Sequence, residues 1–232
     1  MKRKNYSKEI ADAINNFLVQ DDWHFSFDEN CGIFRFNLGL KGKLKKINYV
    51  VDVKDDEYLV LATSPLGAEE ENVQMMANMA EFICRANYGL KMGNFEFDYN
   101  DGEIRFKVHI CCEDVIPTTS IIRRSIYCPA TMFDRYSSGI VDIIFNDASG
   151  KAAVEKCEKH YESRFYSILS ELLGEETATA VLNDEDPEAT AAQLIEQMSI
   201  MANEEDTDQE NDDTDDDDLI IDLFETEGET EE

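Results

Sequence analysis

Three histidines are the first candidates for acid–base chemistry in this chain of 232 residues: His24, His109 and His160. They lie far apart in the sequence, and no recognisable spacing pairs any of them with a nucleophile. The sequence holds neither a Gly-rich phosphate loop nor a Gly-x-Ser-x-Gly elbow. Asp28 and Asp98 each begin a predicted turn, where aspartate is favoured because it bonds its own backbone. We therefore expect no catalytic residues. A hydrolase or transferase would need a pocket that joins His109 to a carboxylate.

The six cysteines do not show the paired spacing of zinc ligands. Cys111 and Cys112 are adjacent, which suits neither an easy disulfide between the two nor a zinc knuckle. We therefore expect reduced structural cysteines, with no metal site and no cofactor.

The hydrophobic pattern of residues 94–110 predicts a β-hairpin, and the sheet that contains it organises the rest of the chain. Phe95 and Phe97 alternate with polar residues, and the turn that follows contains Gly102, which tolerates a positive φ. In the next strand apolar residues alternate with Arg105, Lys107 and His109. One face of the hairpin is therefore apolar and must cover a core, while the other faces water.

The same pattern occurs 70 residues earlier, in residues 24–36. Seven identities at one offset predict an internal structural repeat, and two copies favour one domain built from two related halves. The identical pairs are Phe25/Phe95, Phe27/Phe97, Asp28/Asp98, Asn30/Asn100, Gly32/Gly102, Arg35/Arg105 and Phe36/Phe106.

Periodicity along residues 1–148 predicts the order α-ββββ-α-ββ-α. The helical pattern covers residues 7–20, 68–88 and a stretch from Thr118 that Pro129 should interrupt, because proline disfavours helix at the preceding residue. The strands are expected at residues 23–27, 33–40, 47–53 and 58–64, before the hairpin described above. The fold class is therefore α+β, with an antiparallel sheet of about six strands covered by helices.

Residues 149–202 form a predicted helical extension. Apolar residues recur at spacings of three and four from Gly150 to Leu172, Gly174 ends that helix, and Pro187 begins the last one. The extension can pack on the body, form a partner surface or form a homodimer, and the sequence leaves these alternatives open.

Residues 203–232, here called the acidic tail, contain 17 aspartates and glutamates and no lysine or arginine. This composition cannot bury a core and predicts disorder. One apolar motif interrupts it and resembles a linear docking segment that orders on binding; the alternative is a solvated spacer. The motif consists of Leu219, Ile220, Ile221, Leu223 and Phe224.

The net charge of −30 limits the partners. All 21 basic residues lie at or before Arg164, so the C-terminal third is strongly anionic, repels nucleic acid and anionic lipid, and attracts basic protein surfaces. The lysine-rich turn at residues 41–46 lacks interleaved aromatics, so we expect it to contact the acidic tail or an acidic partner. No apolar run is long enough for a membrane span, and residues 1–12 lack a signal-peptide core, so we expect a cytoplasmic protein.

One segment resembles a known family. The pattern is that of a strand exit, a Met-rich helix and a hairpin, and it is similar to the YbjN-like family. The strand exit is Leu59-Val-Leu-Ala-Thr-Ser-Pro-Leu, and the helix follows it. The segment after the helix is Asn87-Tyr-Gly-Leu-Lys-Met-Gly-Asn-Phe-Glu-Phe-Asp, followed by Asp101-Gly-Glu-Ile-Arg-Phe. These bacterial domains are described as sensory-transduction regulators with a fold like that of type III secretion chaperones. The resemblance covers roughly residues 5–147. It implies the same element order as above and no active site.

These observations favour a non-enzymatic protein-binding module, chaperone-like or a regulatory adaptor, that binds a segment of a partner protein. The partner is expected to be basic, because the acidic tail would attract it. Sheet edges and a groove beside the helix at residues 68–88 are the expected docking surfaces, with Tyr88, Phe95 and Phe97 as groove residues unless they are core. The alternative is an acidic decoy, in which the C-terminal third mimics nucleic acid and occupies a basic protein.

Overall fold

A computed structural model describes residues 5–205 of the chain. The chain divides into two units, Met1–Glu158 and Lys159–Glu232. The first unit opens with α1 (Lys8–Gln20), where the Ser7 hydroxyl accepts a hydrogen bond from the Ile10 N–H at 3.3 Å and so caps the first turn, as the sequence predicts. Among residues 5–205, no helix combines the length and the apolar character needed to cross a bilayer.

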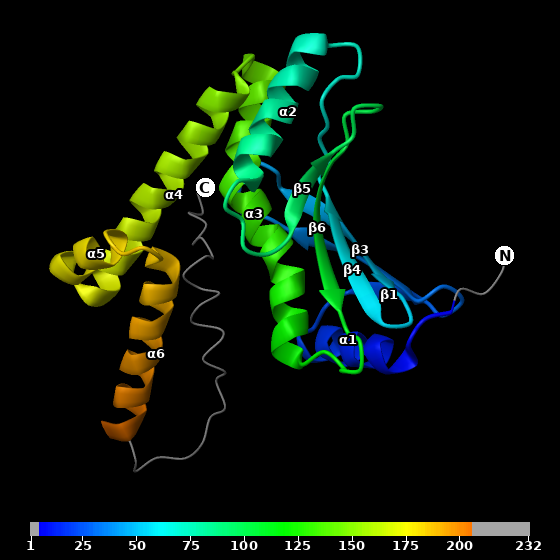
Figure 1. Ribbon diagram of the computed structural model, residues 1–232, viewed down its shortest axis with the longest axis horizontal. Helices are drawn as coiled ribbons and strands as arrows, with labels where there is room; N and C mark the ends of the chain where they lie inside the picture. The colour runs from blue at the N-terminus through cyan, green and yellow to red at the C-terminus, as the bar shows by residue number, and fades with distance from the viewer. Residues whose placement is uncertain (1–4, 206–232) are drawn as a thin grey trace, which may run out of the picture. The chain divides into compact units, whose positions relative to one another are not determined.

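Six antiparallel strands follow in one sheet, in the spatial order β1-β2-β3-β4-β6-β5. The first four form a meander, and β5 and β6 form the predicted hairpin at the opposite edge from β1 (Figure 1). This confirms the predicted fold class and element order. The strands are β1 (Phe25–Asp28), β2 (Ile33–Gly39), β3 (Lys46–Val53), β4 (Glu57–Thr63), β5 (Asn94–Phe97) and β6 (Ile104–Cys111).

The two hairpins at the sheet edges share both their register and their turn. Phe25 pairs with Phe36 across the first hairpin, and Phe95 pairs with Phe106 across the second, so the offset of 70 residues is kept on both strands. In each turn a glycine with φ of +68° or +74° donates its N–H to the aspartate carbonyl four residues earlier. The two hairpins therefore repeat each other in structure as well as in sequence.

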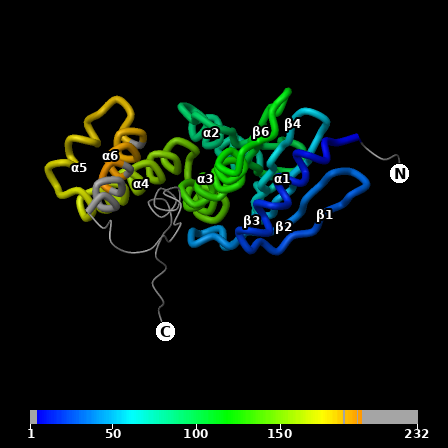
Figure 2. The backbone as a smooth tube through the Cα atoms, turned by 90° about the horizontal axis from the view of Figure 1, so that it is seen from below, coloured from blue at the N-terminus to red at the C-terminus, as the bar shows by residue number. Residues whose placement is uncertain are grey.

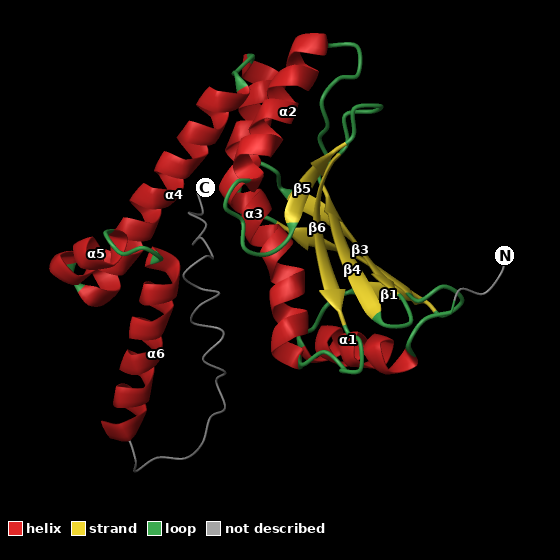
Figure 3. Cartoon of the chain, in the orientation of Figure 1, coloured by secondary structure: helices red, strands yellow, loops and turns green. Residues whose placement is uncertain are grey.

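Three helices cover one face of the sheet: α1, α2 (Val73–Asn87) and α3 (Thr119–Asn146). The helices lie together on one side of the strands (Figure 3), and α3 packs against both α1 and α2 (Figure 2). Their apolar stripes and the inward side chains of the strands form one continuous core. The opposite face of the sheet alternates half-buried apolar residues such as Val50 and Leu61 with polar ones.

Helix α2 begins later than the sequence predicted. The three glutamates at residues 69–71 precede the helix, because Asn72 is its N-cap and accepts a hydrogen bond from the Met75 N–H at 3.0 Å. The helix also ends at Asn87, one residue before Tyr88.

Helix α3 corrects the prediction that Pro129 interrupts the third helix. The helix runs without a break through Pro129, which lies on its buried face. Proline removes one backbone N–H donor and disturbs the preceding turn. In that turn the Ile126 carbonyl accepts a hydrogen bond from the buried hydroxyl of Tyr49 in β3, at 2.8 Å. A side chain of the sheet therefore satisfies a carbonyl of the turn that proline disturbs.

Tyr58 lies in the same layer and gives a test of the buried interface between β4 and α3. Its hydroxyl is 3.0 Å from the Ser125 hydroxyl, and burial raises the pKa of Tyr58 to about 12. Because the pKa is higher in the folded state than in the unfolded state, the protonated Tyr58 hydroxyl stabilises the folded state. This stabilisation is complete below about pH 10 and disappears as the pH rises through about 12. Between these pH values we expect the free energy of unfolding to fall less for Tyr58→Phe than for the native protein.

Chemical unfolding followed by circular dichroism across this range measures the difference. Tyr99→Phe, at a side chain that is 59% exposed, is the matched control and should follow the native curve. A Tyr58→Phe curve that coincides with the native one would contradict the prediction.

Helix α4 (Gly150–Leu173) begins in the first unit and explains why that unit extends beyond the predicted boundary at residue 148. Its Cys157 is buried, and Glu158 accepts hydrogen bonds from both Arg135 and Tyr136 of α3. At Gly139 a side chain would come within 2.4 Å of the Phe82 ring, so glycine permits the close packing of α3 on α2.

The second unit contains the rest of α4, then α5 (Glu175–Leu182) and α6 (Pro187–Glu205). Gly174 ends α4 and Pro187 begins α6, as predicted, whereas α5 was not predicted. Side chains of the three helices pack into a small core of their own. Its buried members are Phe165, Leu169, Ala178, Val181, Ala191 and Ile195.

Candidate functional site

The three groove residues predicted from the sequence lie in three different environments. Phe95 is 2% exposed and packs edge-to-face against the rings of Phe106 and Phe133. It therefore belongs to the core, which corrects its assignment to a groove. Tyr88 is 93% exposed at the end of α2. Phe97 is half-buried at the end of β5 and lines a pocket.

The free edge of the sheet at β5 is partly closed by a side chain of α2. The Asn87 amide donates to the Phe95 carbonyl at 2.9 Å, and its oxygen accepts from the Phe95 N–H at 2.7 Å. Asn87 thus takes the place that a neighbouring strand would have at this residue. Alternate residues of an edge strand face the same way, so the backbone groups of Phe97 also point to the free edge. At Phe97, two residues beyond Phe95, no side-chain bridge like that of Asn87 is found in the described part of the chain, and we call this end of β5 the open end of the edge.

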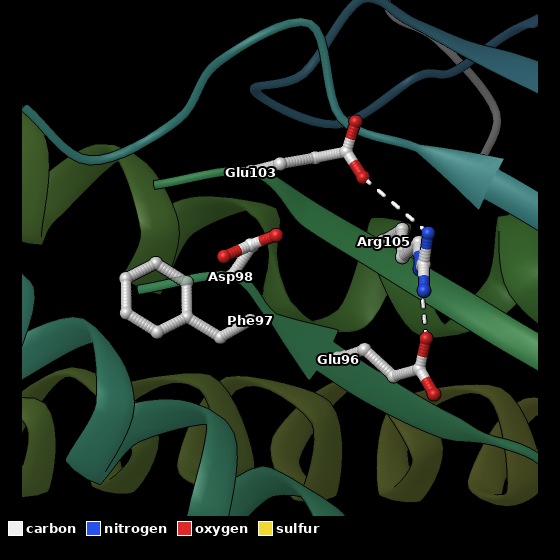
Figure 4. A pocket seen from close by; sticks show the side chains of 5 residues that line it. All are labelled: Glu96, Phe97, Asp98, Glu103 and Arg105. Atoms are coloured by element: carbon white, nitrogen blue, oxygen red, sulfur yellow. Dashed lines mark hydrogen bonds and ion pairs between the residues drawn. The ribbon is translucent and has the colours of Figure 1, made fainter. Parts of the chain in front are cut away.

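A pocket of about 440 Å³ lies at this open end of the β5–β6 hairpin. The lining residues come from the end of β5, the turn, and the start of β6 (Figure 4). The Phe97 ring provides the apolar part of the lining and contacts the exposed ring of Tyr99, with 5.3 Å between ring centroids. The lining residues are Glu96, Phe97, Asp98, Glu103 and Arg105.

The polar part of the pocket is anionic, with three carboxylates and one guanidinium. Arg105 lies between Glu96, at 2.7 Å, and Glu103, at 3.7 Å (Figure 4). Burial alone would raise the pKa of Glu96, but the hydrogen bonds from Lys107 and Arg105 outweigh it and hold the pKa below its ordinary value. The Glu96 carboxylate is therefore ionised at neutral pH, and it is paired with both Arg105 and Lys107, so the carboxylates of the pocket that these two cations do not pair in this way are those of Asp98 and Glu103.

Asp98 has a structural role in the turn beside the pocket. Its carboxylate accepts hydrogen bonds from the Asn100 N–H, at 2.8 Å, and from the Asn100 side-chain amide. This confirms the interpretation of Asp98 as a turn residue. Asp28 makes the equivalent bond to the Asn30 N–H in the first hairpin, at 3.0 Å. The pKa of Asp28 is lowered chiefly by a hydrogen bond with the Cys31 side chain and next by this bond to Asn30.

His109 does meet a carboxylate, but outside this pocket. Its Nε2 is 2.7 Å from Glu57 Oε2 on the neighbouring strand β4, and both side chains are well exposed. The pair lies near the opposite end of these strands from the pocket, since Thr63 of β4 pairs with Arg105. Within residues 5–205, no three histidine, cysteine, aspartate or glutamate side chains group as metal ligands.

Neither a protein-family model nor a curated protein matches the sequence. The similarity to the YbjN-like family, expected over roughly residues 5–147, therefore stays a prediction. Two of the residues on which this similarity rests have a structural role in this chain. Asn87 bridges the β5 backbone, and a side chain at Gly93 would come within 2.4 Å of the Phe106 ring.

Sequence reasoning missed the charged members of the pocket, although the signal was present. A hairpin centred between Asn100 and Asp101 places Glu96 opposite Arg105, and the structure has that pairing. The predicted docking motif in the acidic tail, Leu219, Ile220, Ile221, Leu223 and Phe224, lies outside the described residues.

Proposed function

We propose that this chain is a non-enzymatic protein-binding module of the cytoplasm, chaperone-like or a regulatory adaptor, that binds a basic segment of a partner protein at the β5–β6 hairpin. The observation that carries the proposal is the pocket that combines the half-buried Phe97 ring with three carboxylates at the open end of the sheet edge. An extended segment can pair with the Phe97 backbone, as in strand addition. Its apolar residue would contact Phe97 and Tyr99, and its cationic residue would face the carboxylates.

Two further observations support this proposal. The resemblance to the YbjN-like family implies a scaffold similar to secretion chaperones, which act by holding segments of other proteins. The net charge of −30 would also speed the approach of a basic partner.

The test is a titration of the full chain with a synthetic strand-forming peptide that alternates lysine with valine, followed by amide chemical shifts. We expect the largest shifts at Phe97 and Glu103. The double variant Asp98→Asn, Glu103→Gln should weaken binding about tenfold, since it removes two partly exposed charge interactions. Asparagine keeps the oxygen that accepts from the Asn100 N–H, so the turn should persist.

The matched control is Asp55→Asn, Asp56→Asn. It removes the same charge from two exposed residues in the turn between β3 and β4, at the opposite end of the strands from the pocket. Equal weakening by both double variants would show that only net charge matters and would contradict the proposed site.

The acidic decoy predicts a different pattern. A decoy would bind through the C-terminal third, so the pocket variant would leave its affinity for a basic protein unchanged. Its binding should also collapse above a few hundred millimolar salt, whereas contacts with Phe97 and the strand backbone should persist.

A further inference from the structure

The sheet has a second free edge, at β1, and this edge lacks the bridge that Asn87 makes at β5. The residue 70 positions before Asn87 is Phe17, whose ring is 3% exposed in the core. Among residues 5–205, no hydrogen bond outside the β1–β2 ladder involves the backbone of Phe25 or Phe27. The two related hairpins therefore differ in the feature that protects their edges.

The hydrogen-bond ladder shows which backbone groups of β1 face outward. The Gly32 carbonyl accepts from the Val53 N–H at 2.9 Å, so alternate residues from Gly32 onward bond to β3. The residues between them bond to β1, and one of these pairs with Ser26. Phe25 and Phe27, on either side of Ser26, therefore turn their N–H and C=O groups to the free edge.

The sequence of β1 does little to keep another strand away. Its four residues, Phe-Ser-Phe-Asp, include neither lysine nor proline, the residues that commonly block pairing at an exposed edge. The part of the chain that carries β1 is also only weakly anionic. Residues 1–164 hold 26 acidic residues against 21 basic ones, a balance of −5 out of the total of −30. A second copy therefore meets little local repulsion at this edge.

We propose that β1 pairs with β1 of a second copy, antiparallel about a two-fold axis that passes beside Ser26. In this register Phe25 of each copy exchanges both of its backbone hydrogen bonds with Phe27 of the other, so all outward groups of the two strands are bonded. Moving the axis by one residue leaves one outward residue of each copy without a partner inside β1. The strand is therefore complementary to itself in one register.

The side chains agree with this register. On the core side, each half-buried Phe25 ring lies opposite the half-buried Phe27 ring of the other copy, and aromatic pairs of this kind stabilise antiparallel strands. On the outer face, His24 lies opposite Asp28 of the other copy, and its ring N–H can donate to that carboxylate. A hydrogen bond with the Cys31 side chain is the chief reason for the lowered pKa of Asp28, which is therefore ionised and accepts at neutral pH.

Pairing at β1 would join two six-stranded sheets into one continuous sheet. It leaves each β5 edge free, since β1 and β5 lie at opposite edges. The contact is short, because β1 has only four residues, so we expect reversible association of the kind seen at small interfaces.

Sedimentation velocity of the full chain at increasing concentration tests the pairing. We expect the native chain to form dimers, more readily in higher salt because salt screens the net charge of −30. Ser26→Glu places two like charges directly opposite each other at the axis, and this should raise the dissociation constant of the dimer about fivefold. Ser26→Lys should have the same effect alone. An equimolar mixture of the two variants should associate at least as tightly as the native chain.

Asn48→Glu is the matched control. It adds the same charge at an exposed residue of β3, an interior strand, and should leave the dissociation constant unchanged. Ser26 is exposed as well, so all three variants should keep the native circular dichroism. A native chain that stays monomeric would overturn the proposal. So would equal weakening by Ser26→Glu and Asn48→Glu, or a mixture that associates no better than either variant alone. None of these results depends on the pocket at Phe97, so the two proposals fail separately.

Discussion

Replacing Phe95 with alanine should lower the free energy of unfolding by about 3 to 5 kcal/mol, the range for buried phenylalanine. Its ring is 2% exposed and meets three other rings, those of Phe106, Phe133 and Tyr136, at right angles and at 4.8 to 5.7 Å between centroids. These rings come from β6 and α3, so the cavity would lie where the sheet edge joins the helical layer.

Urea unfolding of the variant measures this loss. The control is Tyr99→Ala, four residues away but 59% exposed, which should change stability by about 0.5 kcal/mol or less. A loss below about 1.5 kcal/mol for Phe95→Ala would mean that the surrounding rings collapse into the space, contrary to a tightly packed core.

Asn87→Ala is expected to cost about 1 to 3 kcal/mol, since it leaves the part-buried Phe95 N–H without its partner and leaves the Phe95 carbonyl with the Asn94 amide alone. Asn87→Asp separates the two bonds, because aspartate keeps the acceptor but loses the N–H donor. The open edge of β5 should also promote pairing between copies, which size-exclusion chromatography at increasing concentration would detect.

Asn94→Ala is the matched control for Asn87. Its amide donates one hydrogen bond to the same Phe95 carbonyl, at 3.1 Å, so the expected loss is about 1 kcal/mol or less. If both variants lose the same stability and associate no more than the native chain, Asn87 does not protect the sheet edge.

The parts of the fold that follow from local pattern were predictable. Alternation predicted the strands, and the repeat predicted two related hairpins. The register also depends on the geometry of the turn, so the Glu96–Arg105 pair was not predicted. Pro129 was misread because the helix there packs its buried face on the sheet, where the hydroxyl of Tyr49, 80 residues earlier in the chain, bonds the Ile126 carbonyl. Such long-range contacts have no local signature.

The pocket and the edge protection could not be predicted for the same reason. Asn87 reads as an ordinary residue near a helix end, and its role depends on how α2 packs beside β5. Tyr88 and Phe95 were both predicted as groove residues together with Phe97. Tyr88 is exposed because it follows the helix, and Phe95 is buried because it faces the core. Residue type alone does not distinguish these positions.

The core of the second unit begins with Phe165, directly after Arg164, the last basic residue of the chain. Trypsin, which cuts after lysine and arginine, can therefore release residues 165–232 only as one uncut peptide, whether or not α5 and α6 are folded. Survival of that peptide in a tryptic digest carries no information about its stability. A protease that cuts beside aspartate or glutamate would report on it, since all 25 charged residues in this stretch are acidic.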